Sequence, residues 1–218
     1  MNISKLLILV TSVAFIASCA TSMEAVNVNI KRGYKNEFSN YLGEGVGSLT
    51  ELIPANETYD HWSSMFSIQF MEGAKNSPSE AMQLLTNIAK KVCGDKYSSS
   101  VIKEDKSSIT FEWKVTNCKQ KDYMKYISRG VAVDDCNLNF FTGVTWMGSK
   151  KFGSPTKCNK IVTQSEIVRL MKGNDGLHRV AYTEKTENIS ESERNKWLAS
   201  LERAFVVKDG NKVIIESN

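Results

Sequence analysis

The chain has 218 residues, 41% of them hydrophobic and 24% charged, which is the composition of a folded protein rather than a disordered one. Its formal net charge of +4 comes without a long run of like charges, so nucleic acid is excluded as an expected partner. The length suits one domain with a sizeable core, or one domain that carries an insertion.

The first eighteen residues have the pattern of an export signal. Lys5 supplies a positive charge, and the apolar segments 6–10 and 13–16 follow it. Together they make an apolar stretch of roughly 12 residues, whereas about 20 are needed to cross a bilayer. We therefore predict a signal peptide over 1–18 and no membrane span in this segment.

The residues Ile16-Ala17-Ser18-Cys19 resemble the lipobox of bacterial lipoproteins. The resemblance implies that the chain is cut before Cys19 and that this cysteine carries fatty-acyl chains such as palmitate. Residues 19–25 would then be a lipidated tether. Ala20, in place of aspartate, resembles the outer-membrane sorting pattern of enteric bacteria. It implies a lipid anchor in the outer membrane of the cell envelope, with the protein facing the periplasm.

Four further cysteines favour two disulfides, because an even number in an exported chain is typical of paired thiols. Three pairings are open. We favour Cys93–Cys118 and Cys136–Cys158, since each closes a loop of about 25 residues and would contribute roughly 3 kcal/mol. A metal site is disfavoured because the chain has no Cys-x-x-Cys pair, and no cofactor is predicted.

A single α+β domain is predicted over 26–218, and its first half contains two strands and a helix. Val26, Val28 and Ile30 alternate with polar residues and predict a strand. The pattern breaks up over 33–56, where the glycine-rich segment 43–48 reads as a flexible loop without the ending of a phosphate loop. A second strand is predicted over 62–70, and a capping box at Ser77 and Glu80 starts a helix that ends at Cys93.

The strongest strand pattern covers 109–115 and leads to Cys118, where an insertion over 119–160 begins. The insertion is unusually aromatic, with Phe140, Phe141, Trp146 and Phe152. A small satellite core is the favoured interpretation, and an exposed partner surface is the alternative.

After the insertion, strands over 166–171 and 177–183 flank an Asp-Gly turn and predict a hairpin. Ser190 and Glu193 start a second amphipathic helix, and short strands are expected at 206–207 and 213–215. Because the strands are mostly antiparallel, the predicted class is α+β, an antiparallel sheet with two amphipathic helices on one face.

Two segments, 57–65 and 176–185, together with Phe111-Glu112-Trp113, Cys118 and Trp197, resemble a group of small, largely uncharacterised envelope lipoproteins and secreted proteins of Gram-negative bacteria. The order of elements over about 50–118 and 161–206 is similar to the PsbP/MOG1-like α/β/α sandwich. The resemblance implies no catalytic residue set.

Six residues form a candidate binding groove if the two strands that carry them are neighbours: Glu57, His61, Trp62, His178, Arg179 and Tyr182. The favoured alternative places Trp62 and Tyr182 in the core and pairs Arg179 with Glu112 or Glu166. The two histidines would then be solvated or hydrogen-bonded locally.

No nucleophile elbow and no metalloprotease motif occurs in the sequence, so a non-catalytic function is favoured. The predicted function is a lipid-anchored binding or adaptor module for another envelope component. A lipoprotein that binds a small molecule or lipid is one alternative. An envelope hydrolase that uses paired carboxylates is the other.

Overall fold

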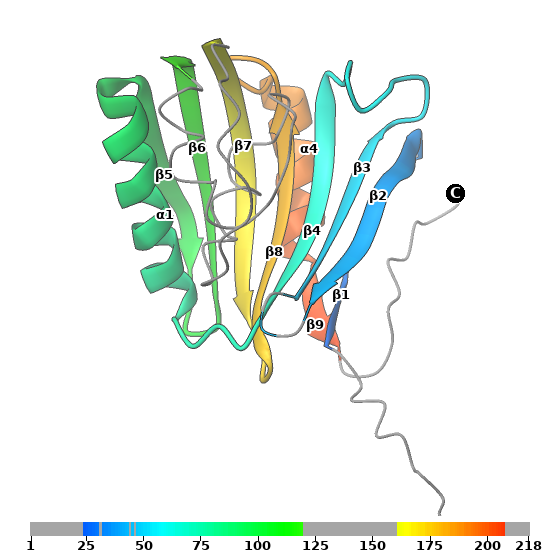
Figure 1. Cartoon of the computed structure of the whole chain (residues 1–218), viewed down its shortest axis with the longest axis vertical. Helices are drawn as coiled ribbons and strands as arrows, with labels where there is room; N and C mark the ends of the chain where they lie inside the picture. Colours follow the sequence, from blue (N-terminus) through cyan, green and yellow to red (C-terminus); the bar gives the residue numbers. More distant parts are fainter. Residues whose placement is uncertain (1–23, 31, 44, 46, 120–160, 208–218) are drawn as a thin grey trace, which may run out of the picture.

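The structure is a computed structural model that describes residues 24–30, 32–43, 45, 47–119 and 161–207 (Figure 1). The predicted signal peptide, Cys19, the aromatic residues of the insertion, the Cys136–Cys158 pair and the strand at 213–215 lie outside these residues. Among the described segments, no helix is both long and apolar enough to cross a membrane.

In the described part of the chain, the domain is built on an antiparallel sheet of seven strands, and the α+β class is confirmed. The strands run in the order β2 (Tyr34–Gly43), β3 (Gly47–Pro54), β4 (Ser64–Glu72), β8 (Gly176–Glu184), β7 (Ile161–Lys172), β6 (Ser108–Lys119) and β5 (Tyr97–Glu104). Two short strands, β1 (Ala25–Asn27) and β9 (Phe205–Val207), pair with each other outside this sheet. Strands β5 and β2 are therefore the two edges of the large sheet as far as the described residues form it.

The helices α1 (Pro78–Cys93) and α4 (Glu191–Glu202) lie on opposite faces of the sheet (Figure 1). Leu85 of α1 packs in one core with Phe111, and Trp197 of α4 packs in another with Phe66 and Tyr182. The expectation that both helices cover one face is wrong. Strand β8 is buried along both faces, but its buried polar residues His178, Arg179 and Thr183 interrupt the continuous apolar run that would have indicated two covered sides.

Both helices begin at the predicted caps. The Ser77 hydroxyl accepts from the Glu80 amide at 3.2 Å, and the Glu80 carboxylate accepts from the Ser77 amide at 2.7 Å. A three-residue 3₁₀ turn (Gly94–Lys96) follows α1. At α4, the Ser190 hydroxyl accepts from the Glu193 amide at 3.3 Å, and the Glu193 carboxylate also accepts from Trp197 Nε1 at 3.1 Å. This last bond ties the cap to the core.

The sequence prediction missed three strands, β2, β3 and β5. Strand β2 contains register shifts between Asn36 and Phe38 and between Tyr41 and Gly43, so its residues do not alternate regularly. Gly47, which the pattern placed in a loop, begins β3 with a φ of +103°. A Cβ there would lie 1.9 Å from the carbonyl oxygen of Phe70, so this glycine permits the close approach of β4.

The predicted Cys93–Cys118 disulfide is present, and it joins the end of α1 to the end of β6. Strands β6 and β7 remain paired as far as Lys119 and Ile161. The described residues Lys119 and Ile161 therefore lie side by side, near this disulfide.

Candidate functional site

The six residues of the predicted groove do not share one surface, although the strands that carry them, β4 and β8, are neighbours. We name the two sides of the sheet after the helix that covers each. Arg179 lies on the α1 face, whereas His178 and Tyr182 lie on the α4 face, because successive side chains of a strand point to opposite faces. Glu57 and His61 lie in the segment before β4.

Trp62 and Tyr182 are core residues, as favoured from the sequence. Trp62 packs with Ile53 and Met65, and Lys185 Nζ lies 3.8 Å above its ring. Tyr182 stacks on Trp197 with ring centroids 4.4 Å apart. Burial raises the pKa of the Tyr182 hydroxyl, which donates to Glu184. His61 is exposed, and the Glu57 carboxylate accepts from the Ser63 amide at 2.7 Å.

A buried charge network on the α1 face contains Arg179 and Glu166, one of the two pairings expected from the sequence. Arg179 Nη2 lies 2.5 Å from Glu166 Oε1, and both side chains are 0% exposed. Arg179 Nη1 also donates to Ser67 at 2.9 Å. Glu166 accepts from Thr183 at 2.6 Å and from Trp113 Nε1 at 2.5 Å. The network links four neighbouring strands, and its role is to fix the centre of the sheet.

A second buried pair joins the start of the described chain to the turn between β7 and β8. Glu24 Oε1 accepts from the Asn174 amide at 2.8 Å, and Oε2 accepts from the Asp175 amide at 3.0 Å. His178 Nε2 lies 3.5 Å from Oε2, and its ring stacks on Phe70. We call this arrangement the Glu24 clamp. The sequence could not indicate it, because Glu24 and the turn lie far apart in the chain.

The Glu24 clamp should make the stability of the protein fall with acidification. Burial lowers the pKa of His178 despite the nearby carboxylate, so this histidine stabilises the fold above pH 6.5 and less as the pH falls below that value. Burial raises the pKa of Glu24, but the hydrogen bonds from Asp175, Asn174 and His178 outweigh it and the net pKa is lowered. The Glu24 contribution is therefore lost as the pH falls through and below 4.5.

Urea unfolding measured from pH 8 to about 4 tests this expectation. His178→Gln should flatten the dependence near pH 6, and Glu24→Gln should cost about 1–3 kcal/mol at neutral pH. His61→Gln removes the exposed histidine and serves as the matched control. Equal pH profiles for the His178 and His61 variants would show that the clamp does not titrate as described.

The described residues form a surface groove of about 320 Å³ on the α4 face, beside the edge strand β5. Its walls come from β5, β6, β7, the 187–189 loop and the start of α4. Its main polar side chains are Ser98, Ser100, Glu112, Lys114, Ser165, Asn188 and Arg194. We call it the β5 groove.

The β5 groove presents charged groups of both signs that are partly accessible to solvent. Arg194 Nε lies 2.8 Å from Glu112 Oε2, and these side chains are 33% and 37% exposed. Ser100 donates to the other Glu112 oxygen at 3.1 Å, and Lys114 Nζ donates to Asn188 Oδ1 at 3.0 Å. The arrangement can bind backbone amides, carboxylates or ammonium groups through exchangeable hydrogen bonds.

The sequence contained only part of the signal for the β5 groove. Glu112 and Lys114 fall on the polar side of a clear alternation, and such residues are usually solvated. Their partners Asn188 and Arg194 lie much later in the chain, and the strand β5 itself was not predicted. The pairing of β5 with β6 and the packing of the 187–189 loop and α4 on this face bring the groups together.

No group of three or more His, Cys, Asp or Glu side chains that could hold a metal ion occurs within the described ranges. Neither the models of protein families nor the curated proteins contain a match to this chain. The fold and the site describe an α+β domain with a polar surface groove at one sheet edge.

Proposed function

We propose that the protein is a lipid-anchored, non-catalytic component of the cell envelope whose domain binds another envelope protein through the β5 groove. The lipobox-like residues that end at Cys19 supply the anchor. The Cys93–Cys118 disulfide supports export, because disulfides persist in oxidising compartments such as the periplasm. The carboxylate of Glu112, held by Arg194 and Ser100, is suited to recognition by charge pairing.

The position of the groove beside the edge strand β5 is the observation that carries the proposed binding function. Among the residues that the structure describes, β5 pairs only with β6, so its other side presents backbone N–H and C=O groups. The segment Ser98–Val101 contains no proline and no charge that would oppose pairing, and Ser98 and Ser100 line the groove. An extended segment of a partner can add to this edge while its alternate side chains enter the groove.

We also propose that the fold is the PsbP/MOG1-like sandwich. One helix on each face of an antiparallel sheet supports this assignment, since a three-layer α/β/α arrangement is the main feature of that fold.

Site-specific photo-crosslinking in intact cells tests the proposed binding function. A photoreactive amino acid at Ser100 should give one defined protein adduct, whereas the same group at Asn36, an exposed position on the opposite edge strand, should not. Glu112→Arg should lower the adduct yield about tenfold, which corresponds to about 1.4 kcal/mol. Lys35→Glu, in an exposed ion pair on β2, is the matched charge-reversal control and should leave the yield unchanged.

Two results would contradict the adaptor function. Equal adducts from Ser100 and Asn36 would show that the β5 edge has no special affinity. Absence of any protein adduct, together with a melting temperature raised by a small ligand, would favour the small-molecule alternative. The volume of the β5 groove, about 320 Å³, is large enough for this alternative, because typical ligand sites begin at about 300 Å³.

A further inference from the structure

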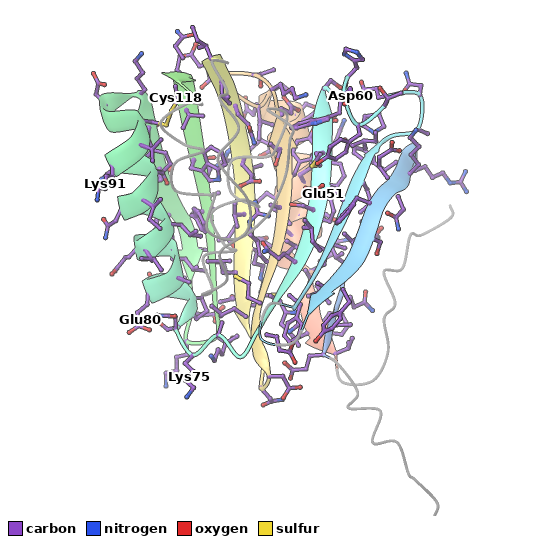
Figure 2. The ribbon with its side chains drawn as sticks, viewed as in Figure 1. Glu51, Asp60, Lys75, Glu80, Lys91 and Cys118 are labelled. Atoms are coloured by element: carbon purple, nitrogen blue, oxygen red, sulfur yellow. A yellow bond between two sulfur atoms is a disulfide. The ribbon has the colours of Figure 1, made fainter. Side chains whose placement is uncertain are left out.

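We infer that the Glu24 clamp holds one end of the domain against the membrane surface, so that the β5 groove points away from the lipid. The inference rests on the proposed lipid anchor at Cys19. The end in question, which we call the turn end, contains the β7–β8 turn, the β5–β6 turn and the loop before α1. Figure 2 places Lys75 and Glu80 at this end and Cys118 and Asp60 at the other.

The length of chain between the anchor and the clamp sets the distance. Glu24 is 3% exposed, and its carboxylate is held by the backbone of Asn174 and Asp175, so the chain is fixed to the turn end at this residue. Five residue steps separate Glu24 from Cys19, and at about 3.6 Å each they reach at most about 18 Å. An acylated Cys19 therefore holds the turn end close to the lipid headgroups.

The composition of the turn end suits a headgroup surface rather than insertion. Its turns expose Lys75, Lys106 and Asn174, which are polar or charged. Tyr41 near the end of β2 and Phe205 in β9 are 45% and 53% exposed. Tyr41 also donates to Glu72 at the lower end of β4, which places it at this end of the sheet. Aromatic side chains beside polar groups are favoured at a membrane interface.

The β5 groove lies toward the opposite end. Ser98 pairs with Lys114, and Ser165 pairs with Glu184, the last residue of β8. Strand β8 begins at the clamped turn with Gly176, and its nine residues span roughly 30 Å. A domain that stands on its turn end thus presents the groove to the periplasm, where a partner can reach it.

Fluorescence quenching in vesicles tests this orientation. The full mature lipoprotein carries a fluorescent amino acid at Lys75 or at Asp60 and is placed in phosphatidylethanolamine–phosphatidylglycerol vesicles with a headgroup nitroxide quencher. We expect at least about twofold stronger quenching at Lys75, because the two ends lie roughly 30 Å apart. Inserting a Gly/Ser spacer of about ten residues after Ala20, which adds about 35 Å of reach, should abolish the difference.

A substitution in the turn tests the clamp itself. A methyl group at Gly173 would lie 2.1 Å from Glu24 Oε2, so Gly173→Ala should displace the carboxylate and reduce the difference in quenching. Glu24→Gln, which keeps the side-chain volume, should act in the same direction. Glu37→Gln, at an exposed carboxylate on β2, is the control and should leave the difference unchanged.

The outcomes separate this inference from the proposed anchor. Acylation of Cys19, read from intact mass, and flotation with vesicles report on the anchor alone. A protein that is acylated and floats but shows equal quenching at Lys75 and Asp60 overturns the orientation only. Loss of acylation overturns both. A difference that survives the spacer overturns the role of the tether length, and one that survives Gly173→Ala and Glu24→Gln overturns the role of the clamp.

Discussion

Replacing Arg179 by methionine should lower the free energy of unfolding by about 3–5 kcal/mol. The substitution leaves Glu166 as a buried carboxylate without its cation, and the side chain of Glu166 is 0% exposed. Two other donors to Glu166, Thr183 and Trp113, are neutral and do not replace the charge. Urea unfolding at pH 7, followed by circular dichroism with the disulfide intact, measures the loss.

Two further variants show whether the loss comes from the unpaired charge. Glu166→Gln keeps an acceptor oxygen for Trp113, so the double variant with Arg179→Met should be more stable than Arg179→Met alone. Arg194→Met breaks the exposed pair with Glu112 and should cost at most about 1 kcal/mol. A smaller loss for Arg179→Met than for Arg194→Met would contradict the account of the network.

Cys19→Ser should abolish acylation and move the protein from the membrane fraction to the soluble fraction. The hydroxyl of serine is a much poorer nucleophile than a thiol, and without acyl chains the proposed anchor has no hydrophobic contribution to membrane binding. Labelling with an alkyne analogue of palmitate, followed by fractionation after a high-salt wash, measures both effects.

Ser18→Ala is the matched control for this substitution, because it keeps a small residue directly before the cysteine. It should preserve labelling and membrane retention. A Cys19→Ser protein that stays with the membranes after high salt would mean that the interpretation of 16–19 as a lipobox is wrong.

The local parts of the fold could be predicted because their signals are contained in short segments. The capping box at Ser77, the alternation that became β6 and the hairpin of β7 and β8 each combine a period with a start or stop residue. The Cys93–Cys118 pairing followed from loop length and from the positions at which a helix and a strand end.

The missed parts depend on contacts between distant segments. Strand β2 carries two register shifts, and β5 has one between Val101 and Lys103, so neither shows a clean period of two. The groove predicted from the sequence did not form at Arg179. Adjacent residues of one strand point to opposite faces, so Arg179 cannot share a surface with His178 even though β4 and β8 are neighbours. The β5 groove includes Arg194 from α4, and no local sequence pattern indicates which face of the sheet α4 covers.

The pairing of β4 with β8 has a consequence for the order of folding. Ser64 pairs with Glu184, so the centre of the sheet joins an early segment to a late one. Contacts between residues distant in sequence form slowly, because a long loop must close before they contribute. The N-terminal strands therefore lack their central neighbour until most of the chain has been synthesised. A chain that completes its core so late stays unfolded during most of its synthesis, and this property would favour the proposed export of the protein before it folds.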